Sequence, residues 1–533
     1  MKLVTAEAMR EADRTTIEDM EFPGMVLMEN AGMRVTEAIM SLEPPSRRVV
    51  VLAGPGNNGG DGLVVARHLN RLGVSVSVWC AASPESYKGD ALTNLSFLQK
   101  KKVPIQHITD ETQLDEMSQD FARADLIVDA LLGTGTGRLV EGLFAHLVEA
   151  VNATRTPVLA VDIPSGIDAN TGEVLGVAVK ALWTVTFAFP KRGLMLYPGA
   201  DYAGKVTVGE IDISPRALPF EGMDIIAPGQ VSRLLPRRPG YAHKGSFGRT
   251  LLVAGSPGMT GAAVLAGESA LRGGAGLVHL ATARSLRGIV EAKTVELISH
   301  NLPEDGEGHI TSQAADLILQ WAENCEVLAI GPGLYPSEET YSLLEKIIPA
   351  CPVPMVIDAG GLTALSAGPE ILLKARSPVV VTPHPGEMVG LTGLRVKEIE
   401  GDRLDLPAKM ARSWNFVVAL KGAPTVLGFP DGSSWVNPTG GPTLASAGTG
   451  DLLTGLIAGF ISQGATAEEA TLCGVFLHGL AGDIAAEERR GVKAGDVLLR
   501  FPAAFRTVLE HNWEPALFGP FHRDLRPRYR LDQ

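Results

Sequence analysis

Three apolar runs of strand length in the first half of the chain each end in a turn that contains glycine. The runs are residues 48–54, 125–133 and 157–166. The first turn is followed by apolar side chains at helical spacing, namely Val64, Val65, Leu69 and Leu72, with His68 on the same face. Repeated strand, turn and helix predict a mostly parallel sheet with helices on its faces, which binds ligands at the carboxyl ends of its strands.

The second half of the chain has the same pattern. Its predicted strands are residues 250–255, 277–283, 326–331, 354–358, 379–382 and 416–421. We therefore expect the α/β class and two three-layer α/β/α domains, the first of them Rossmann-like. A chain of 533 residues exceeds what one hydrophobic core usually supports. Prolines between residues 214 and 240 place the boundary near residue 225, which predicts domains at 1–224 and 225–504 and a C-terminal tail at 505–533.

The charge and the cysteines narrow the class of function. The net charge is −13, from 60 acidic and 47 basic residues, which disfavours the basic surface that nucleic-acid binding needs. The four cysteines are far apart in the sequence and indicate neither disulfides nor a zinc site. The sequence shows neither an apolar signal region nor a run long enough for a membrane span. We expect a cytoplasmic enzyme with small-molecule partners.

Glycine-rich segments at 437–441 and 447–455 place Asp451 where an apolar helix begins. The free N–H groups and the positive dipole end of a helix favour an anion such as phosphate. A carboxylate is a poor phosphate ligand, but it can take a proton from a hydroxyl that attacks phosphorus. The segment thus indicates phosphoryl transfer. The structural alternative is a glycine turn capped by a surface aspartate.

In the first half, residues 54–62 carry a literal G-x-G-x-x-G with the polar residues Asn57, Asn58 and Asp61 added. Asp61 could hold ribose hydroxyls or simply cap the next helix. Two further strand ends contribute Asp129 and Ser165. With Asn58 they could offer oxygen ligands to a cation, although a buried Asp129 with satisfied hydrogen bonds is the alternative.

In the second half, His384 stands between two prolines that stiffen its loop, which favours a positioned contact group. Lys421 follows a predicted strand and could neutralise a nucleotide phosphate. The chain contains neither G-x-x-x-x-G-K-[ST] nor H-E-x-x-H, which argues against P-loop nucleotide hydrolysis and zinc proteolysis.

From about Thr5 to about Phe501 the chain resembles the bifunctional NAD(P)HX repair enzymes. The first half resembles the NAD(P)HX epimerase domain through residues 28–32, 57–61, 133–138 and 162–166. The second half resembles the ADP-dependent NAD(P)HX dehydratase, which has a ribokinase-like fold. The segments that carry this second resemblance are residues 243–245, 254–256 and 261–263 and the turns at Gly333, His384, Lys421 and Asp451.

The resemblance implies metabolite repair of nicotinamide nucleotides (NAD and NADP) that have taken up water on the reduced ring. The first domain would epimerise the R and S hydrates, NADHX and NADPHX, and the second would dehydrate the S form with ADP. The enzyme would thus be both an isomerase and a lyase, and we expect a homo-oligomer. In the first domain the resemblance assigns substrate contacts to Asn57, Asn58, Gly59, Gly60, Asp61, Gly133, Thr134, Gly135, Thr136, Gly137, Arg138, Leu139 and Asp162. It assigns potassium (K⁺) to Asn58, Asp129 and Ser165.

In the second domain the resemblance assigns substrate contacts to Ala262, Gly333, His384 and Asp451, and adenine nucleotide contacts to Lys421, Gly422, Ala423, Pro424, Thr425 and Gly450. Phosphorylation of the ring hydroxyl turns it into a good leaving group. We expect Asp451 to take the hydroxyl proton, and magnesium (Mg²⁺) to accompany the nucleotide. For the epimerase step we expect Asp162 to be catalytic, with Asp61 as the competing residue.

One segment departs from the pattern that the resemblance predicts. Residues 441–447 contain Ser446 and Ala447 where the family is expected to be richer in Asn, Met and Gly. A backbone with positive φ there would be strained, which weakens the preference for ADP over ATP. Two other functions are possible. The chain could be a ribokinase-type small-molecule kinase, or its first domain could be a Rossmann-like binding or oligomerisation module.

Overall fold

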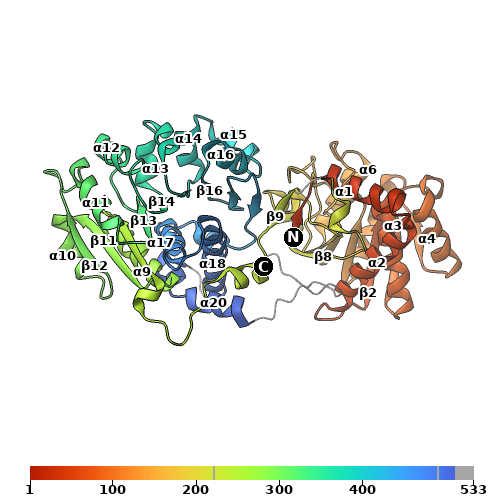
Figure 1. Ribbon diagram of the computed structural model, residues 1–533. Helices are drawn as coiled ribbons and strands as arrows, with labels where there is room; N and C mark the ends of the chain where they lie inside the picture. The colour runs from red at the N-terminus through yellow and green to blue at the C-terminus, as the bar shows by residue number, and fades with distance from the viewer. Residues whose placement is uncertain (220–221, 489–490, 511–533) are drawn as a thin grey trace. The chain divides into compact units, whose positions relative to one another are not determined.

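The computed structural model describes residues 1–219, 222–488 and 491–510. These residues form two compact units, one of which ends at Gly222 while the other begins at Met223 (Figure 1). Helix α20 (Phe501–Glu510) continues past position 505, where the tail was expected to begin. The basic residues expected in this tail, Arg523, Arg526, Arg528 and Arg530, lie outside the described residues. None of the helices in the described ranges is both long and apolar enough to cross a bilayer.

The first unit contains a seven-stranded parallel sheet in the order β4-β3-β2-β5-β6-β7-β8. Its strands are β2 (Arg48–Ala53), β3 (Ser75–Cys80), β4 (Ile105–His107), β5 (Leu126–Ala130), β6 (Val158–Val161), β7 (Trp183–Phe187) and β8 (Lys205–Gly209), and a two-residue strand β1 (Lys2–Leu3) precedes them. The chain crosses from one half of this sheet to the other between β2 and β5. Such a switch point opens a crevice at the carboxyl ends of the strands.

Helices cover both faces of this sheet (Figure 1). One face packs against α1 (Ala6–Arg14), α2 (Gly24–Met40), α3 (Asn57–Arg71) and α4 (Gly89–Lys100). The other face packs against α5 (Leu114–Arg123) and α6 (Leu143–Ala153). The short helix α7 (Gly199–Ala203) precedes β8. Because both faces are buried, β2 and β5 are apolar apart from Arg48 and Asp129, which explains why they stand out in the sequence.

The second unit contains a larger sheet in the order β9-β18-β17-β16-β15-β14-β13-β10-β11-β12. Its strands are β9 (Met223–Ile225), β10 (Arg249–Val253), β11 (Leu277–Ala283), β12 (Ile298–Leu302), β13 (Val327–Ile330), β14 (Met355–Ile357), β15 (Val379–Val381), β16 (Val417–Leu420), β17 (Val426–Gly428) and β18 (Ser434–Val436). From β12 to β16 the neighbours are parallel, whereas β17 is antiparallel to both β16 and β18. The switch point lies between β10 and β13.

Helices also cover both faces of the second sheet. One face packs against α8 (Pro228–Leu234), α9 (Thr260–Gly273), α10 (Arg287–Glu291), α17 (Thr449–Ser462), α18 (Ala467–Glu488), α19 (Ala494–Leu498) and α20. The opposite face packs against α11 (Ala315–Ala322), α12 (Glu338–Ile347), α13 (Gly360–Leu365), α14 (Pro385–Thr392), α15 (Val396–Gly401) and α16 (Leu406–Trp414). Both units are therefore three-layer α/β/α structures, and the predicted fold class is confirmed.

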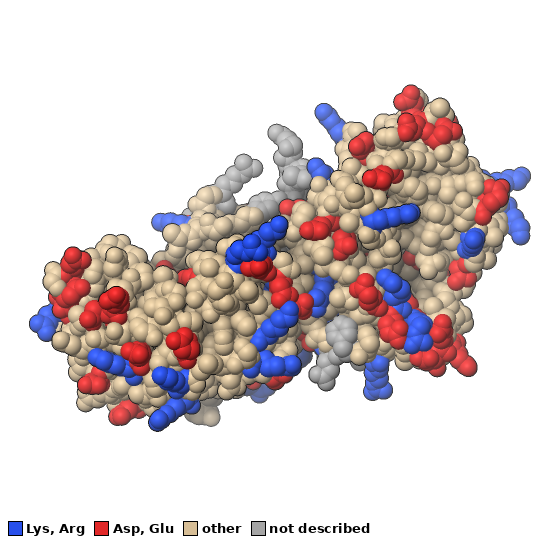
Figure 2. Space-filling view, turned by 90° about the horizontal axis from the view of Figure 1, so that it is seen from above, with Lys and Arg blue, Asp and Glu red and all other residues tan. Residues whose placement is uncertain are grey.

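Acidic and basic side chains are interspersed over the face shown in Figure 2. They do not gather there into the basic stripe that nucleic-acid binding requires.

Candidate active sites

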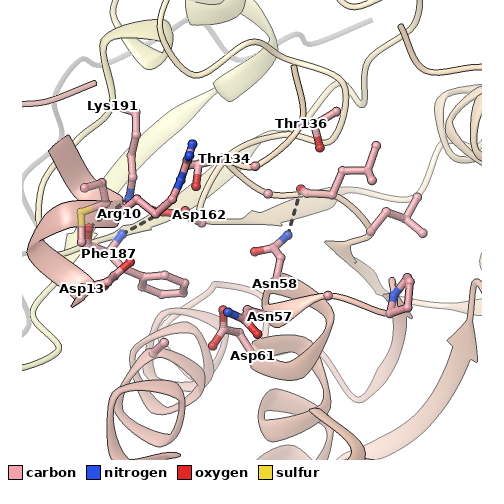
Figure 3. Close-up of a pocket in the computed structure, with 18 of the residues that line it drawn as sticks. Arg10, Asp13, Asn57, Asn58, Asp61, Thr134, Thr136, Asp162, Phe187 and Lys191 are labelled. Atoms are coloured by element: carbon pink, nitrogen blue, oxygen red, sulfur yellow. Dashed lines mark hydrogen bonds and ion pairs between the residues drawn. The ribbon is translucent and has the colours of Figure 1, made fainter. Parts of the chain in front are cut away.

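The first unit holds a cavity of about 1100 Å³ at the switch point between β2 and β5. Figure 3 shows Asn57, Asn58 and Asp61 pointing into it from α3, with Asp162 and Lys191 on the other side. Arg10 and Asp13 reach it from α1. The turn after β5 also lines it, with Gly133, Thr134, Gly135, Thr136, Gly137, Arg138 and Leu139. Most of the side chains predicted for this site therefore share one cavity.

The segment 57–61 forms the first turns of a helix rather than a loop. The N-cap of α3 is Gly56, and no side chain caps the helix, so the interpretation of Asp61 as a cap is wrong. Gly59 and Gly60 do not line the cavity. A Cβ at Gly59 would lie 1.8 Å from the carbonyl oxygen of Gly54, and one at Gly60 would lie 2.5 Å from Met28 Cε. These two glycines let α3 approach its neighbours closely.

Asp162 is held by three donors on one oxygen. Lys191 Nζ lies 2.5 Å from Asp162 Oδ1, Thr186 Oγ1 donates to it at 3.0 Å, and the Phe187 N–H donates at 3.2 Å. The Lys191 side chain is fully buried and also donates to the carbonyl oxygen of Phe187. These contacts place Asp162 Oδ1 in a charge-assisted ion pair with Lys191 at the wall of the cavity.

Two other carboxyl groups in this cavity have raised pKa values. Burial raises the pKa of Asp61 well above its usual range, and the charges of Asp162 and Asp13 add to the effect. Burial raises the pKa of Asp13 to about 6; Lys191 opposes this shift and Asp162 adds to it. Lys191 is therefore the positive charge that acts on three carboxyl groups, those of Asp162, Asp61 and Asp13. The sequence did not single out Lys191 or Asp13, because a lysine after a strand and an acid in an amphipathic helix are common surface features.

The predicted oxygen cluster lies beside this cavity. Ser165 donates from both N and Oγ to the buried Asp129 carboxylate, at 2.8 and 2.6 Å, and the Leu131 N–H donates at 3.2 Å. Burial nevertheless raises the pKa of Asp129 to about 6. Asn58 Nδ2 donates to the carbonyl oxygen of Leu132 at 3.0 Å, while Asn58 Oδ1 is buried with no partner among the described residues. Asp129 is thus hydrogen-bonded, as the structural alternative expected, and the unsatisfied oxygen belongs to Asn58.

In the second unit, strand ends and one helix bring the predicted residues together. Asp358 follows β14, His384 follows β15 and Lys421 follows β16, all at the carboxyl edge of the parallel strands. The first turn of α17 lies against them. Thr454 Oγ1 donates to Asp358 Oδ2 at 2.7 Å, and a Cβ at Gly450 would lie 3.4 Å from Lys421 Nζ.

Asp451, in the first turn of α17, therefore lies in a cluster of charged groups. Lys421 Nζ is 2.7 Å from Asp358 Oδ1 and 3.7 Å from Glu387 Oε2. Burial raises the pKa of Asp451 to about 7; Asp358 and Glu387 add to the shift and Lys421 opposes it. A carboxyl group that titrates near neutrality is suited to accepting a proton. The interpretation of Asp451 as a surface cap does not fit this burial.

His384 is the N-cap of α14, and its orientation is set by the backbone. Its Nδ1 accepts hydrogen bonds from the N–H groups of Gly386 and Glu387, at 3.0 and 3.2 Å. In the neutral ring the proton must therefore lie on Nε2. The side chain is 57% exposed, so this N–H can donate to a ligand.

Ala262 and Gly333 lie together at the switch point of the second sheet, because a Cβ at Gly333 would be 2.9 Å from that of Ala262. The loop 421–425 is held from behind by the buried Arg403, which donates to the carbonyl oxygens of Lys421 and Pro424 at 3.3 and 3.0 Å. Sequence reasoning gave no role to Arg403, Asp358, Glu387 or Thr454. Asp358 could have been identified, since it directly follows an apolar strand and precedes two glycines.

Two glycines of the segment before α17 lie in the left-handed region that glycine favours. Gly440 and Gly448 have φ values of 90° and 91°, whereas Ser446 and Ala447 are not among the residues with positive φ. The expected departure at residues 441–447 therefore introduces no backbone strain.

Two family descriptions match the chain. "YjeF-related protein N-terminus" matches residues 24–193, and "NAD(P)H-hydrate dehydratase" matches residues 250–500. A curated protein of Moorella thermoacetica, named bifunctional NAD(P)H-hydrate repair enzyme, is 43% identical over 517 residues, which cover 96% of this chain and 98% of the relative. The chain belongs to this family of bifunctional NAD(P)H-hydrate repair enzymes. The family expected from the sequence is confirmed.

A second relative of the same name, from Thermofilum pendens, is 39% identical and covers 96% of this chain and 97% of its own length. Among solved structures, an ADP/ATP-dependent NAD(P)H-hydrate dehydratase from Bacillus subtilis, co-crystallised with ATP and Mg²⁺, is 31% identical. It covers 54% of this chain and all of its own, with a TM-score of 0.47. The yeast protein YNL200c is 26% identical and covers 39% of this chain and 87% of its own, with a TM-score of 0.34. As a bifunctional NAD(P)H-hydrate repair enzyme, the chain combines an epimerase domain with a ribokinase-like dehydratase domain.

Proposed function

We propose that this chain repairs hydrated nicotinamide nucleotides in two steps. The first unit interconverts the R and S epimers of NADHX and NADPHX, and the second dehydrates the S epimer to NADH or NADPH with ADP as phosphoryl donor, giving AMP and phosphate. The observation that carries the second step is the burial of Asp451 at the start of α17. There it lies among Asp358, Lys421 and Glu387 with a pKa of about 7.

The chemistry of the second step follows from the leaving group. Hydroxide leaves carbon reluctantly, whereas phosphate leaves readily. Asp451 takes the proton of the ring hydroxyl as its oxygen attacks the terminal phosphorus of ADP, and AMP departs. Elimination of phosphate, with loss of the neighbouring ring proton, then restores the double bond. The N–H groups of residues 448–450 face the transferring phosphoryl group at the positive end of α17 and stabilise its charge.

The remaining assignments in the second unit divide between substrate and nucleotide. Ala262, Gly333 and His384 would contact the hydrated ring and its nucleotide, with His384 donating from Nε2. The adenine nucleotide would lie on the backbone of the loop 421–425 and on Gly450. The Lys421 ammonium group donates a hydrogen bond to Asp358. It would therefore have two roles, to orient the charged groups around Asp451 and to attract phosphate. Mg²⁺ would enter with the nucleotide phosphates and neutralise part of their charge.

In the first unit, Asn57, Asp61, Asp162 and the turn 133–139 would hold the substrate. Gly59 and Gly60 would contribute by letting α3 approach the strand ends. The donor set at Asn58, Asp129 and Ser165 fits K⁺. It consists of hard oxygens, and the buried Asn58 Oδ1 has a lone pair that no described residue satisfies. A bound K⁺ would satisfy that oxygen and offset the buried charge of Asp129.

The test is to incubate the purified chain with a mixture of hydrated NADH epimers and ADP, or ATP in a parallel sample, and to follow the return of dihydronicotinamide absorbance. We expect Asp451→Asn to abolish turnover while calorimetry still detects ADP binding. The matched control is Asp316→Asn, which removes an exposed carboxylate from α11 of the same unit. A stable phosphate ester in place of NADH would instead identify a ribokinase-type kinase. A homo-oligomer and a cytoplasmic location stay predictions from the sequence.

A further inference from the structure

Asp61 lines the first cavity, as Asp162 does, but differs from Asp162 in its partners. Within the described residues it makes no hydrogen bond or ion pair, although Asp162 receives three donors a short way across the cavity. Figure 3 shows Asp61 rising from α3 on one side and Asp162, with Lys191, on the other. A substrate between them would meet a carboxyl group on each side.

The charge of the cavity explains how the two groups differ. The ammonium group of Lys191 is buried beside this cavity, and its shortest contact, 2.5 Å, is with Asp162. Asp61 lies in the same field with no donor of its own, and burial together with the charges of Asp162 and Asp13 raises its pKa well above the usual range. Lys191 thus pairs with Asp162 and not with Asp61, and the raised pKa of Asp61 favours its protonated form.

We propose that Asp61 is the acid that protonates the departing hydroxyl group during epimerisation, and that Asp162 accepts the proton of the water that adds from the opposite side. This inference rests on the proposed epimerase function and deepens it, because it assigns the two proton-transfer roles. The sequence led us to expect Asp162 alone to be catalytic. The proposal instead makes Asp162 the base and Asp61 the acid.

Asp61 gives its proton to the hydroxyl oxygen on C6 of the ring, the C6–O bond breaks, and water leaves. The lone pair of ring N1 forms an N1=C6 double bond, so the ring becomes an iminium cation, which the Asp162 carboxylate stabilises. Water then adds to C6 from the other face, the π electrons return to N1, and the released proton goes to Asp162. Proton exchange through solvent returns Asp61 to its acid form.

Other charged groups also face this cavity and shape its pH dependence. They are Arg10 and Asp13 on α1, Asp90 on α4, Arg138 and Glu141 after β5, and Lys191 after β7. Among the carboxyl groups in this set, the pKa of Asp13 is raised to about 6, so Asp13 is largely ionised at neutral pH and reinforces protonation of Asp61.

The experiment uses the second unit of the same chain as an internal control. A mixture of epimers is supplied with excess ADP, and each epimer is followed by chromatography. In the wild type we expect both epimers to disappear. In Asp61→Asn we expect the S epimer to be consumed at the wild-type rate, and enzymatic conversion of the R epimer to fall by about 10²- to 10⁴-fold, the usual contribution of a general acid. Asp115→Asn, an exposed carboxylate on α5, should behave as the wild type.

Further measurements separate catalysis from folding. Hydrogen–deuterium exchange should show the first unit of Asp61→Asn protected as in the wild type, and hydrated NADH should still bind. Asp61→Glu, which keeps an ionisable acid, should recover part of the lost rate. If the first unit of Asp61→Asn is less protected from exchange than that of the wild type, the rate of Asp61→Glu is compared with that of the wild type instead. In ¹⁸O-labelled water, the wild type should place solvent oxygen on C6 at each epimerisation, and its rate should fall as pH rises through the raised pKa of Asp61.

The outcomes are distinguishable. If the wild type consumes the R epimer no faster than buffer does, the proposed epimerase function itself fails. If the wild type consumes it and Asp61→Asn does so at a similar rate, Asp61 is not the acid. If epimerisation proceeds without incorporation of solvent oxygen, the C6–O bond does not break and the proposed step is wrong.

Discussion

The Lys421–Asp358 ion pair allows a quantitative prediction. Lys421 Nζ lies 2.7 Å from Asp358 Oδ1 and 3.7 Å from Glu387 Oε2. At an effective dielectric constant of about 20, these separations correspond to attractions of about 6 and about 4.5 kcal/mol. Desolvation of the ammonium group opposes them, since the Lys421 side chain is only 20% exposed and that of Asp358 only 1%. Removing one member of a buried pair typically costs about 3 to 5 kcal/mol, because the other charge is left without a partner.

We therefore expect Lys421→Met to lower the free energy of unfolding of the second unit by about 3 to 5 kcal/mol. The double variant Lys421→Met/Asp358→Asn should lose less, because it leaves no unpaired buried carboxylate at that position. The control is Lys409→Met. Lys409 pairs with Asp402 at 2.6 Å but is 60% exposed, and such surface pairs contribute only about 0 to 1 kcal/mol.

Pulse-labelling hydrogen exchange over a series of urea concentrations measures the unfolding of each unit separately, through peptides from β16 and α17 for the second unit. The first unit should unfold at the same urea concentration in every variant. Equal effects of Lys421→Met and Lys409→Met would refute the reasoning. Two ion pairs of nearly equal length would then contribute equally to the free energy of unfolding, whether buried or exposed.

Three further predictions concern pH, potassium and packing. The rate of dehydration should rise with pH through about 7, because Asp451 must be ionised to accept a proton and burial raises its pKa to that value; a flat pH–rate profile would exclude it as the base. When K⁺ replaces a non-binding cation at a concentration one hundred times its dissociation constant, calorimetry should show the first unit stabilised by about 2.7 kcal/mol. Asn58→Ala should remove this stabilisation. Gly54→Ala should prevent stable folding of the first unit, as judged by its exchange protection, because the added Cβ would lie 1.9 Å from the carbonyl oxygen of Leu131.

The sequence predicted the central strands of both sheets but not the outer ones. All nine predicted runs are strands, because strands covered on both faces are continuously apolar. The edge strand β12 (Ile298–Leu302) contains Ser299, His300 and Asn301 and has no such signal. The strands β17 and β18 are only three residues long and form an antiparallel pair, which the parallel pattern does not predict.

The candidate sites were predictable to the extent that their residues follow strands or begin helices. Asp162 follows β6, Asn58 and Asp451 lie in the first turns of α3 and α17, and Asp129 lies at the end of β5. Lys191 was not predictable. It reaches Asp162 because the chain before α1 pairs with the segment after β7, where Val4 and Lys191 form a parallel bridge. A contact between residues so distant in the sequence leaves no local pattern.

The two clusters share one electrostatic arrangement, which raises the pKa of one carboxyl group in each unit. In each unit a buried lysine is paired with one aspartate, Lys191 with Asp162 and Lys421 with Asp358, at 2.5 and 2.7 Å. The paired aspartate thus largely cancels the lysine charge. Desolvation then raises the pKa of a further carboxyl group nearby, Asp61 in the first unit and Asp451 in the second. In the second unit Lys421 still opposes the upward shift in the pKa of Asp451, which stops near 7 and suits a base. In the first unit burial and the charges of Asp162 and Asp13 raise the pKa of Asp61 well above its usual range, Lys191 opposes the shift, and the raised pKa suits an acid.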